Sequence, residues 1–363
     1  MDTFDLLRSP HLRDSLSPKP VGVALCLTLA VGGCSAVDVR KTAPETPPVS
    51  DAVSYSSIDL QLGERLYPNE VLIADKISTV IETSIREQYS PGSARRDAHP
   101  KAHGCVRAKV SDSTRADTKR DARGIAVKVL GVPASKLLQD EEQATTQDFI
   151  MINHPVFFAT DPARYLSFME DVNSGKVYRK VLIPIALGFK GTVIALETRN
   201  SRISNPLQTR YWSMVPYQLG TGPARQAVKY SVRACSAATD TLPKSPGHDY
   251  LHDALRASLQ KGDACMEFLV QPRTSTSMDI EDSRIEWKES QAPFYPVAMI
   301  RIPRQVFDTP EQNEFCENLS FTPWHALPEH KPLGVTNRLR KVIYDRVSRV
   351  RHEMNETKRQ EPQ

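Results

Sequence analysis

The segment Thr336–Arg351 reads TNRLRKVIYDRVSRVR, and it contains the two residues from which the fold and the chemistry of this chain can be predicted. Arg340 and Tyr344 are four positions apart, so on a helix both side chains lie on one face. A guanidinium held beside a phenol favours the phenolate, because an opposite charge stabilises the ionised form. A phenolate is a known axial ligand of haem iron. The same spacing also arises by chance on basic helices, where it marks only a solvated charged face.

Two segments far upstream give this pair more weight. The sequence RDAH at residues 96–99 ends in His99, whose imidazole can accept and return a proton near neutral pH. The sequence INHPVFF at residues 152–158 contains Asn153, whose amide can hydrogen-bond a peroxide. Together the three segments supply an iron ligand, an acid–base group and a hydrogen-bond donor, which is the set that peroxide chemistry requires.

On these residues the chain resembles the haem catalases, and specifically the small bacterial catalase-related peroxidase branch. The resemblance runs from about Leu60 to Arg351, and its motifs keep their order along the chain. Besides the helix with Arg340 and Tyr344, the matching stretches are RRDAHPKAHGCVRA (95–108), KRDARGIAVKVLGV (119–132), TQDFIMINHPVFFATDPARYLSF (146–168) and RIPRQVFDTPEQNEFCENLSFTPWHALPEHKPLG (301–334).

The resemblance implies an α+β fold, with a catalase-like antiparallel β-barrel core and C-terminal helices. The hydrophobic pattern agrees with this fold class. An apolar stripe predicts a helix over Val71–Gln88, and further helices are expected at Pro162–Val172 and Tyr250–Gln260. Runs rich in β-forming residues predict strands at 124–130, 180–189, 192–198, 227–232, 265–270 and 297–302.

For holding the haem, the resemblance implies four residues. Tyr344 would be the axial ligand of the iron in haem b, and Arg340 would keep it ionised. Arg96 would pair with a haem propionate. Phe321 resembles the aromatic residue beside the haem, although packing alone also explains a phenylalanine there.

For the opposite side, the resemblance implies that His99 is the acid–base catalyst and that Asn153 holds the peroxide over the iron. Without its motif, Asn153 would be an ordinary turn residue. A rival interpretation joins His99 and His103 as a metal-binding pair on a helix. Pro100 and Gly104 argue against a helix there, so His103 is assigned a structural role.

The chain departs from the family between His99 and Arg123. The family carries an additional strand and loop there, with an arginine and a serine near the haem, whereas RAKVSDSTRADTKRDARG (107–124) passes almost directly to the next motif. Ser111 is the candidate remnant of that serine and would belong to the haem site. A missing strand would open an edge in the sheet. Either the chain pairs its strands differently around the gap, or its haem site is impaired.

The implied function is that of a haem-dependent hydroperoxidase, which reduces hydrogen peroxide or organic hydroperoxides through a ferryl intermediate. A small organic reductant would complete a peroxidase cycle, and a second peroxide would complete a catalase cycle. Two alternatives stay open: a hydroperoxide isomerase of the allene oxide synthase type, and a degenerate haem-binding envelope protein. A homodimer is compatible with any of these. The net charge of +4 is small and its charged residues are spread along the chain, so no nucleic-acid partner is expected.

The cysteines are interpreted as free thiols, because no C-x-x-C spacing occurs among them and no disulfide framework is suggested. Two of the six lie near the N-terminus and four are scattered along the chain, namely Cys26, Cys34, Cys105, Cys235, Cys265 and Cys316.

The N-terminal apolar run Val21–Gly33 has the size of a secretory signal and ends before Cys34, as in a bacterial lipobox. We therefore expect lipid attachment at Cys34 and a location in the cell envelope or periplasm, although acidic residues among the first twenty weaken this interpretation and a cytoplasmic location is the alternative. The expected organisation is a leader at 1–34, a tether at 35–59, the haem domain at 60–352 and a polar tail at 353–363.

Overall fold

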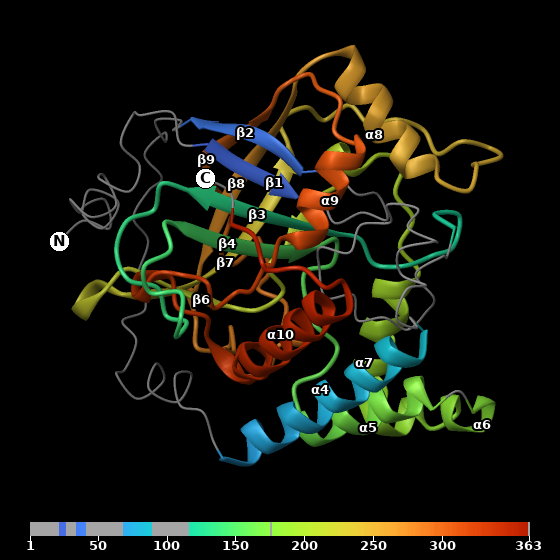
Figure 1. Cartoon of the computed structure of the whole chain (residues 1–363). Helices are drawn as coiled ribbons and strands as arrows, with labels where there is room; N and C mark the ends of the chain where they lie inside the picture. Colours follow the sequence, from blue (N-terminus) through green and yellow to red (C-terminus); the bar gives the residue numbers. More distant parts are fainter. Residues whose placement is uncertain (1–21, 27–33, 41–67, 89–115, 175, 362–363) are drawn as a thin grey trace.

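The computed structural model describes residues 22–26, 34–40, 68–88, 116–174 and 176–361, and Figure 1 shows their arrangement. The strands are β1 (Gly22–Cys26), β2 (Cys34–Arg40), β3 (Gly124–Leu130), β4 (Thr146–Ile152), β5 (Tyr211–Trp212), β6 (Tyr217–Leu219), β7 (Gln226–Ala234), β8 (Ala264–Pro272) and β9 (Tyr295–Ile302). The helices are α4 (Pro68–Gln88), α5 (Pro162–Asn173), α6 (Val177–Lys180), α7 (Ile183–Arg199), α8 (Tyr250–Lys261), α9 (Pro310–Asn318) and α10 (Gly334–Met354). Three short 3-10 turns lie at Pro206–Gln208, Gly222–Ala224 and Pro328–His330.

The described strands form one antiparallel sheet in the order β5-β4-β3-β1-β2-β9-β8-β7-β6. The sheet curls into a half-barrel, and the predicted barrel is therefore not fully closed. Its two ends approach each other only through the two-residue strand β5, which pairs Trp212 with Ile152 of β4 and also pairs with β7. So short a strand leaves the barrel open on this side.

A hairpin from the N-terminal part of the chain occupies the middle of the sheet. Strand β1 pairs with β3, from Val23 opposite Val129 to Cys26 opposite Ala126, and β2 pairs with β9. Strand β1 thus covers the side of β3 that β4 does not. The leader at 1–34 stays a prediction, and β1 and β2 are a competing use of the same residues.

The two faces of the sheet bury different side chains. Strand β3 alternates, so that Ile125 and Val127 point into the large core inside the curled sheet. Ala126 points to the opposite face, where it joins a smaller cluster with Tyr344 of α10. Lys128, the next residue on that face, is also fully buried. The sheet therefore separates an apolar interior from a face that carries both apolar and charged groups.

The helices α4, α5, α7 and α10 form a second layer with its own apolar core, visible in the lower part of Figure 1. Ile77 of α4 and Ile343 of α10 are buried in this core. Arg338 joins α10 to α4 through two hydrogen bonds to Glu70, at 2.8 Å each, and also bonds Glu281. Burial lowers the pKa of Arg338, but the two carboxylates outweigh it and raise the pKa above its usual value.

Most of the predicted elements are confirmed, including the helices at 71–88, 162–172 and 250–260 and the four strands that became β3, β7, β8 and β9. The strands predicted at 180–189 and 192–198 are wrong, because these residues form α6 and α7. Their β-branched and aromatic residues favour strands, but Ala186, Leu187 and Ile194 are spaced to bury one face of a helix in the second core. No helix within the described ranges is long and apolar enough to span a bilayer.

The assignment of free thiols is also wrong for two cysteines. Cys235, which follows β7, and Cys265 of β8 form a disulfide, with their Cα atoms 5.5 Å apart. The backbone pairing of the two strands brings the residues together, since Cys235 N donates to Cys265 O at 3.1 Å. A separation of 30 residues in the sequence gave no indication of this register.

Candidate functional site

Helix α10 begins at Gly334, and its position is fixed by a close approach to another segment. Gly334 has φ of +82°, a region that favours glycine. A Cβ atom at this position would collide with the carbonyl oxygen of Ile280. The next residue is held as well, because Val335 N donates to the Glu281 carboxylate at 2.8 Å. These contacts set the position of the helix that carries Arg340 and Tyr344.

Arg340 and Tyr344 meet on one face of α10, as their spacing predicts. Arg340 Nη2 donates to the phenol oxygen of Tyr344 at 2.9 Å, and the guanidinium lies 5.0 Å from the centre of the phenol ring. The other nitrogen, Nη1, donates to Asn337 Oδ1 at 3.1 Å and to the phenol of Tyr217 at 3.4 Å. Both members of the pair are buried. A hydrogen bond from a buried cation strongly favours ionisation of the phenol.

Arg340 keeps its positive charge although it is buried. Burial lowers the pKa of Arg340, but the oxygens of Tyr344 and Tyr217 outweigh it and raise the pKa, so the guanidinium stays charged. Burial raises the pKa of Tyr165, and the nearby Tyr344 adds to that increase. Arg340 therefore stays positively charged. Of its two hydrogen bonds to phenols, the one to Tyr344 is shorter than the one to Tyr217.

The ring of Tyr344 lies in the apolar cluster on the outer face of the sheet. This cluster contains Ala126 of β3, Ile150 of β4, and Leu319 and Phe321 from the segment before α10. The structure thus brings together three of the predicted site residues, Arg340, Tyr344 and Phe321. A phenol oxygen that is hydrogen-bonded by an arginine and surrounded by apolar side chains is a chemically suitable donor for the iron of a haem. On this side the residues fit the group.

The remaining predicted residues, Arg96, His99, His103 and Ser111, lie outside the described residues. Their assigned roles stay predictions.

Asn153 is described, and its side chain holds two segments together. Its Oδ1 accepts from the backbone N of Arg123 at 2.7 Å, and its Nδ2 donates to Ser201 Oγ at 2.7 Å. Its backbone N also donates to Arg123 O at 2.9 Å. Asn153 therefore ties the start of β3 to the end of β4. An amide has two N–H groups and two acceptor positions, so these contacts leave the predicted contact with peroxide untested.

A buried network of charged residues lies on the same face of the sheet. Its members on the strands lie two residues from Ala126 on β3 and two residues from Ile150 on β4. Lys128 Nζ lies 2.7 Å from Asp148 Oδ1 and 3.1 Å from Glu361 Oε2. The Nζ atom also lies 5.1 Å from the ring centre of Phe321, which places the network beside the site.

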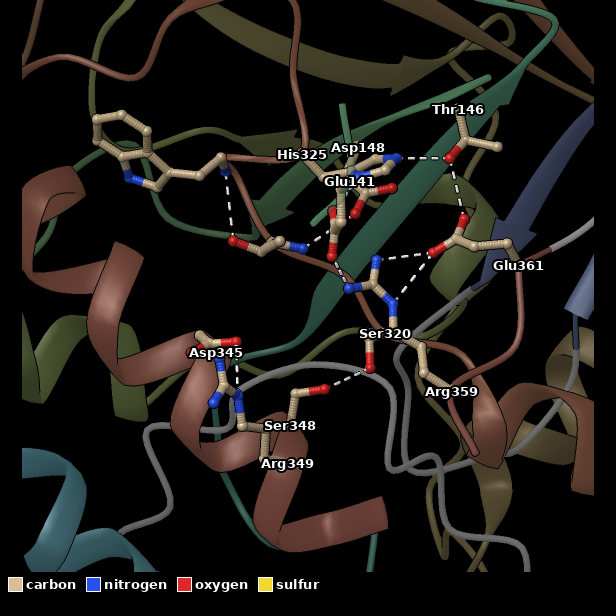
Figure 2. Close-up of polar contacts among 12 residues, drawn as sticks. Glu141, Thr146, Asp148, Ser320, His325, Asp345, Ser348, Arg349, Arg359 and Glu361 are labelled. Atoms are coloured by element: carbon tan, nitrogen blue, oxygen red, sulfur yellow. Dashed lines mark hydrogen bonds and ion pairs between the residues drawn. The ribbon is translucent and has the colours of Figure 1, made fainter. Parts of the chain in front are cut away.

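Figure 2 shows how this network continues away from the sheet. Thr146 donates to Glu361 at 2.9 Å and contacts His325, which in turn contacts Glu141. Arg359 bonds both Glu141 and Glu361, so residues after α10 are held against the sheet. The polar composition of residues 353–363 suggested a tail, and no local pattern indicated that Glu361 meets a lysine 233 positions away.

The pKa shifts in the network follow from burial and from its ion pairs. Burial raises the pKa of Asp148, although Lys128 opposes the change. Burial would also raise the pKa of Glu361, but Lys128 and Arg359 outweigh it and lower the pKa. Burial lowers the pKa of His325, so the neutral imidazole is favoured. The network therefore places the Lys128 ammonium and the Glu361 carboxylate close to Phe321 of the site.

Sequence comparison does not assign the chain to a group. No protein-family model matches the sequence, and no curated protein matches it.

Solved structures, in contrast, share its fold. The chain is similar to a fungal catalase, with a TM-score of 0.52 and 18% identity over 66% of this chain and 50% of that one. It is also similar to catalase A from Saccharomyces cerevisiae, with a TM-score of 0.50 and 17% identity over 68% of this chain and 53% of that one. The chain spans about half the length of these two catalases. At such low identity the likeness concerns the fold alone, and over the residues that are covered the chain has the fold of the catalases.

Proposed function

We propose that the chain is a haem-dependent hydroperoxidase of the small catalase-related peroxidase type, acting on hydrogen peroxide or organic hydroperoxides. The observation that carries the proposal is the buried Arg340–Tyr344 hydrogen bond at 2.9 Å, in a chain with a catalase-like fold. An oxygen ligand of this kind raises the electron density on a bound iron, which favours cleavage of a peroxide bond.

The residues of the chain would divide the remaining work. Tyr344 would hold the haem b iron, and Arg340 would keep the phenol ionised. Phe321 and Ile150 would exclude water from the phenol side, since both lie in the cluster with Tyr344. On the opposite side, His99 would move a proton between the oxygens of the peroxide while Asn153 positions it. Arg96 and Ser111 would contact the edge of the haem.

The test is a titration of the purified protein with hemin, followed by its absorption spectrum. The wild-type protein should bind one haem and give the spectrum of a phenolate-ligated ferric iron. Tyr344→Phe should lose most of this binding. Tyr165→Phe is the matched control, because Tyr165 is a nearby phenol for which the structure gives no hydrogen bond to Arg340. A wild-type protein that binds no haem, or a Tyr344→Phe variant with an unchanged spectrum, would refute the proposal.

We further propose that the protein works in an oxidising compartment such as the bacterial envelope or periplasm. The Cys235–Cys265 disulfide supports this location, because structural disulfides persist mainly outside the reducing cytoplasm. This support does not depend on lipid attachment at Cys34, which stays a separate prediction. Peptide mapping of the protein purified without reductant should recover the peptides of Cys235 and Cys265 joined to each other. Recovery of both residues as free thiols would remove the support.

A further inference from the structure

A row of large apolar side chains is exposed along α6 and α7. Phe189, Val193 and Leu196 follow one another at helical spacing on one side of the second part of α7. Phe189 is 89% exposed, and Val181 and Ile185 are 74% exposed each. We call this row the apolar ridge, and its members are Tyr178, Val181, Leu182, Ile185, Phe189, Val193 and Leu196.

The other side of the segment is firmly packed, so the fold itself presents the ridge. Leu187 and Ile194 are buried in the core of the helical layer. Gly191 lies so close to the carbonyl of Phe158 that a Cβ atom would collide with it. Gly188, with φ of +69°, bends the segment between Ile185 and Phe189. Figure 1 shows α6 and α7 at the rim of the molecule, away from the sheet.

Positive charge accompanies the ridge. Residues 176–199 contain five basic residues and one acidic residue, Glu197, which gives a local net charge of +4. This segment therefore has an excess of positive charge next to its exposed apolar side chains. Lys176 and Lys190 are exposed beside the ridge. The Asp171 carboxylate lies 3.6 Å from Arg179 Nε and neutralises part of this charge.

We propose that the apolar ridge docks on a membrane surface that contains anionic phospholipids. A helical segment with aromatic and aliphatic residues on one side and Lys or Arg beside them is typical of interfacial binding. Its apolar side chains would enter the boundary between headgroups and acyl chains, and the basic residues would meet the lipid phosphates. Helix α7 has 17 residues and is interrupted at Gly188, so it would lie along the membrane surface and would not cross the bilayer.

A second copy of the chain is the competing occupant, and charge disfavours it. In a two-fold dimer built on the ridge, each segment of net charge +4 would face its own copy. The like charges would lie at the rim of a small apolar contact, where they repel. An anionic membrane satisfies the apolar and the charged groups at the same time.

Membrane docking through the ridge requires neither haem binding nor lipid attachment at Cys34. The ridge lies on α6 and α7, whereas Arg340 and Tyr344 lie on α10. A protein that fails to bind haem could still bind membranes through the ridge, and the two proposals can therefore fail separately.

The experiment is co-sedimentation of the full chain with two kinds of vesicle, phosphatidylcholine alone and an equimolar mixture of phosphatidylcholine and phosphatidylglycerol. We expect binding to the mixed vesicles that weakens with added salt. The double substitution Ile185→Asp with Phe189→Asp should weaken this binding by about tenfold or more. Val306→Asp is the matched control, because Val306 is 61% exposed but lies outside the ridge. It should bind like the wild type.

A second measurement locates the contact. Phe189→Trp should show a blue-shifted emission that a bromine-labelled acyl chain quenches, whereas Val306→Trp should show neither effect. Sedimentation velocity on the same variants tests the competing dimer. The proposal is overturned if the wild type ignores the mixed vesicles, if the ridge and control variants bind equally, or if the ridge substitutions only dissociate a dimer.

Discussion

At the scale of single residues, the buried positive charge of Arg340 has to be balanced by its neighbours. Its hydrogen-bond partners within the described residues are the oxygens of Tyr344, Tyr217 and Asn337. A buried cation is costly unless a negative charge lies beside it. An ionised Tyr344 phenol would supply that charge, and for this reason the proposed function assigns the phenolate to Tyr344.

The two members of the pair should therefore fail in different ways when substituted. Tyr344→Phe removes the iron ligand and should abolish haem binding or weaken it drastically. Arg340→Ala should keep haem bound but alter the spectrum and slow peroxide consumption by about tenfold or more, because the phenol is no longer held as its anion. Absorption spectra and stopped-flow mixing measure both effects. Equal loss of haem in the two variants would contradict these separate roles.

His99 and Asn153 should differ in the same kind of experiment. His99→Ala removes the proton carrier and should slow the first reaction with peroxide far more than Asn153→Ala, which loses only positioning. Asn153→Ala should also lower the free energy of unfolding by about 1–3 kcal/mol, since it leaves Arg123 N and Ser201 without their partner. His103→Ala should be mild. Stopped-flow rates and urea unfolding give the two rankings, and a larger rate loss for His103→Ala would reverse the choice of base.

Lys229 should make stability depend on pH. Its ammonium is buried, donates to Ile285 O at 3.2 Å and lies 5.1 Å from the ring centre of Trp287. Burial lowers its pKa from 10.5 to about 7, and Glu286 opposes the change only in part. Between about pH 7 and 10.5 the unfolded chain therefore binds more protons at this site than the folded chain. The site's contribution to stability rises with pH through this window and is lost as pH falls toward 7.

Lys229→Met should remove that contribution to the slope, which amounts to at most about 1.4 kcal/mol per pH unit. Urea unfolding at pH 7, 8 and 9 measures the slope for the wild type and the variant. Lys244→Met is the control, because Lys244 is exposed and should leave the slope unchanged. Parallel curves for the wild type and Lys229→Met would show that the buried lysine does not set the dependence.

At the scale of elements, the sequence predicted the helices and strands whose hydrophobic pattern matches the side chains that they bury. The stripe over Val71–Gln88 was found as α4 because its apolar side is packed, whereas the strand Gly124–Leu130 was found as β3 because its run of β-forming residues is buried on both faces. Helices α6 and α7 were missed because their outward side is apolar, which removes the contrast on which a helical period depends. The exposed apolar side chains of the ridge led to the prediction of strands at 180–189 and 192–198, and the same side chains support membrane docking.

Helix α10 offers a direct test of how elements are positioned. Gly334→Ala would force an unfavourable φ and a collision with the Ile280 carbonyl. We expect it to lower the free energy of unfolding by more than about 1 kcal/mol, and to weaken haem binding by displacing the helix. Gly247→Ala is the matched control, since a Cβ atom there meets nothing within 4 Å. Urea unfolding and hemin titration compare the two, and equal stability would show that α10 tolerates the shift.

At the scale of the whole molecule, the sequence indicated the catalase-like fold but not how the sheet is completed. The hairpin of β1 and β2 pairs with β3 and β9, which lie far away in sequence. Its apolar run is equally compatible with a secretory signal, and composition alone cannot separate a buried strand from a leader. The network of Lys128, Asp148 and Glu361 was missed for a related reason, because only the folded sheet brings these residues together.

Truncation distinguishes the two uses of the N-terminal residues. A chain that begins at Cys34 lacks β1, so β3 and β2 lose the strand between them, and its urea midpoint should fall clearly below that of the wild type. A chain that begins at Gly22 keeps the hairpin and should match the wild type. Mass spectrometry of the mature N-terminus provides the companion measurement. Equal stability of both truncations, together with a lipid on Cys34, would favour the leader over the hairpin.

The packing of the helical layer limits what a membrane-bound molecule could reach. Helix α5 contacts both α7, which carries the ridge, and α10, which carries Tyr344. The buried side chains of α7 and α10 share one core, so this core lies between the exposed ridge and α10. A peroxide that is still embedded in the bilayer would have to leave it to pass this layer. A membrane-bound form of this protein would therefore act on peroxides that have left the lipid phase, as a scavenger stationed above the surface.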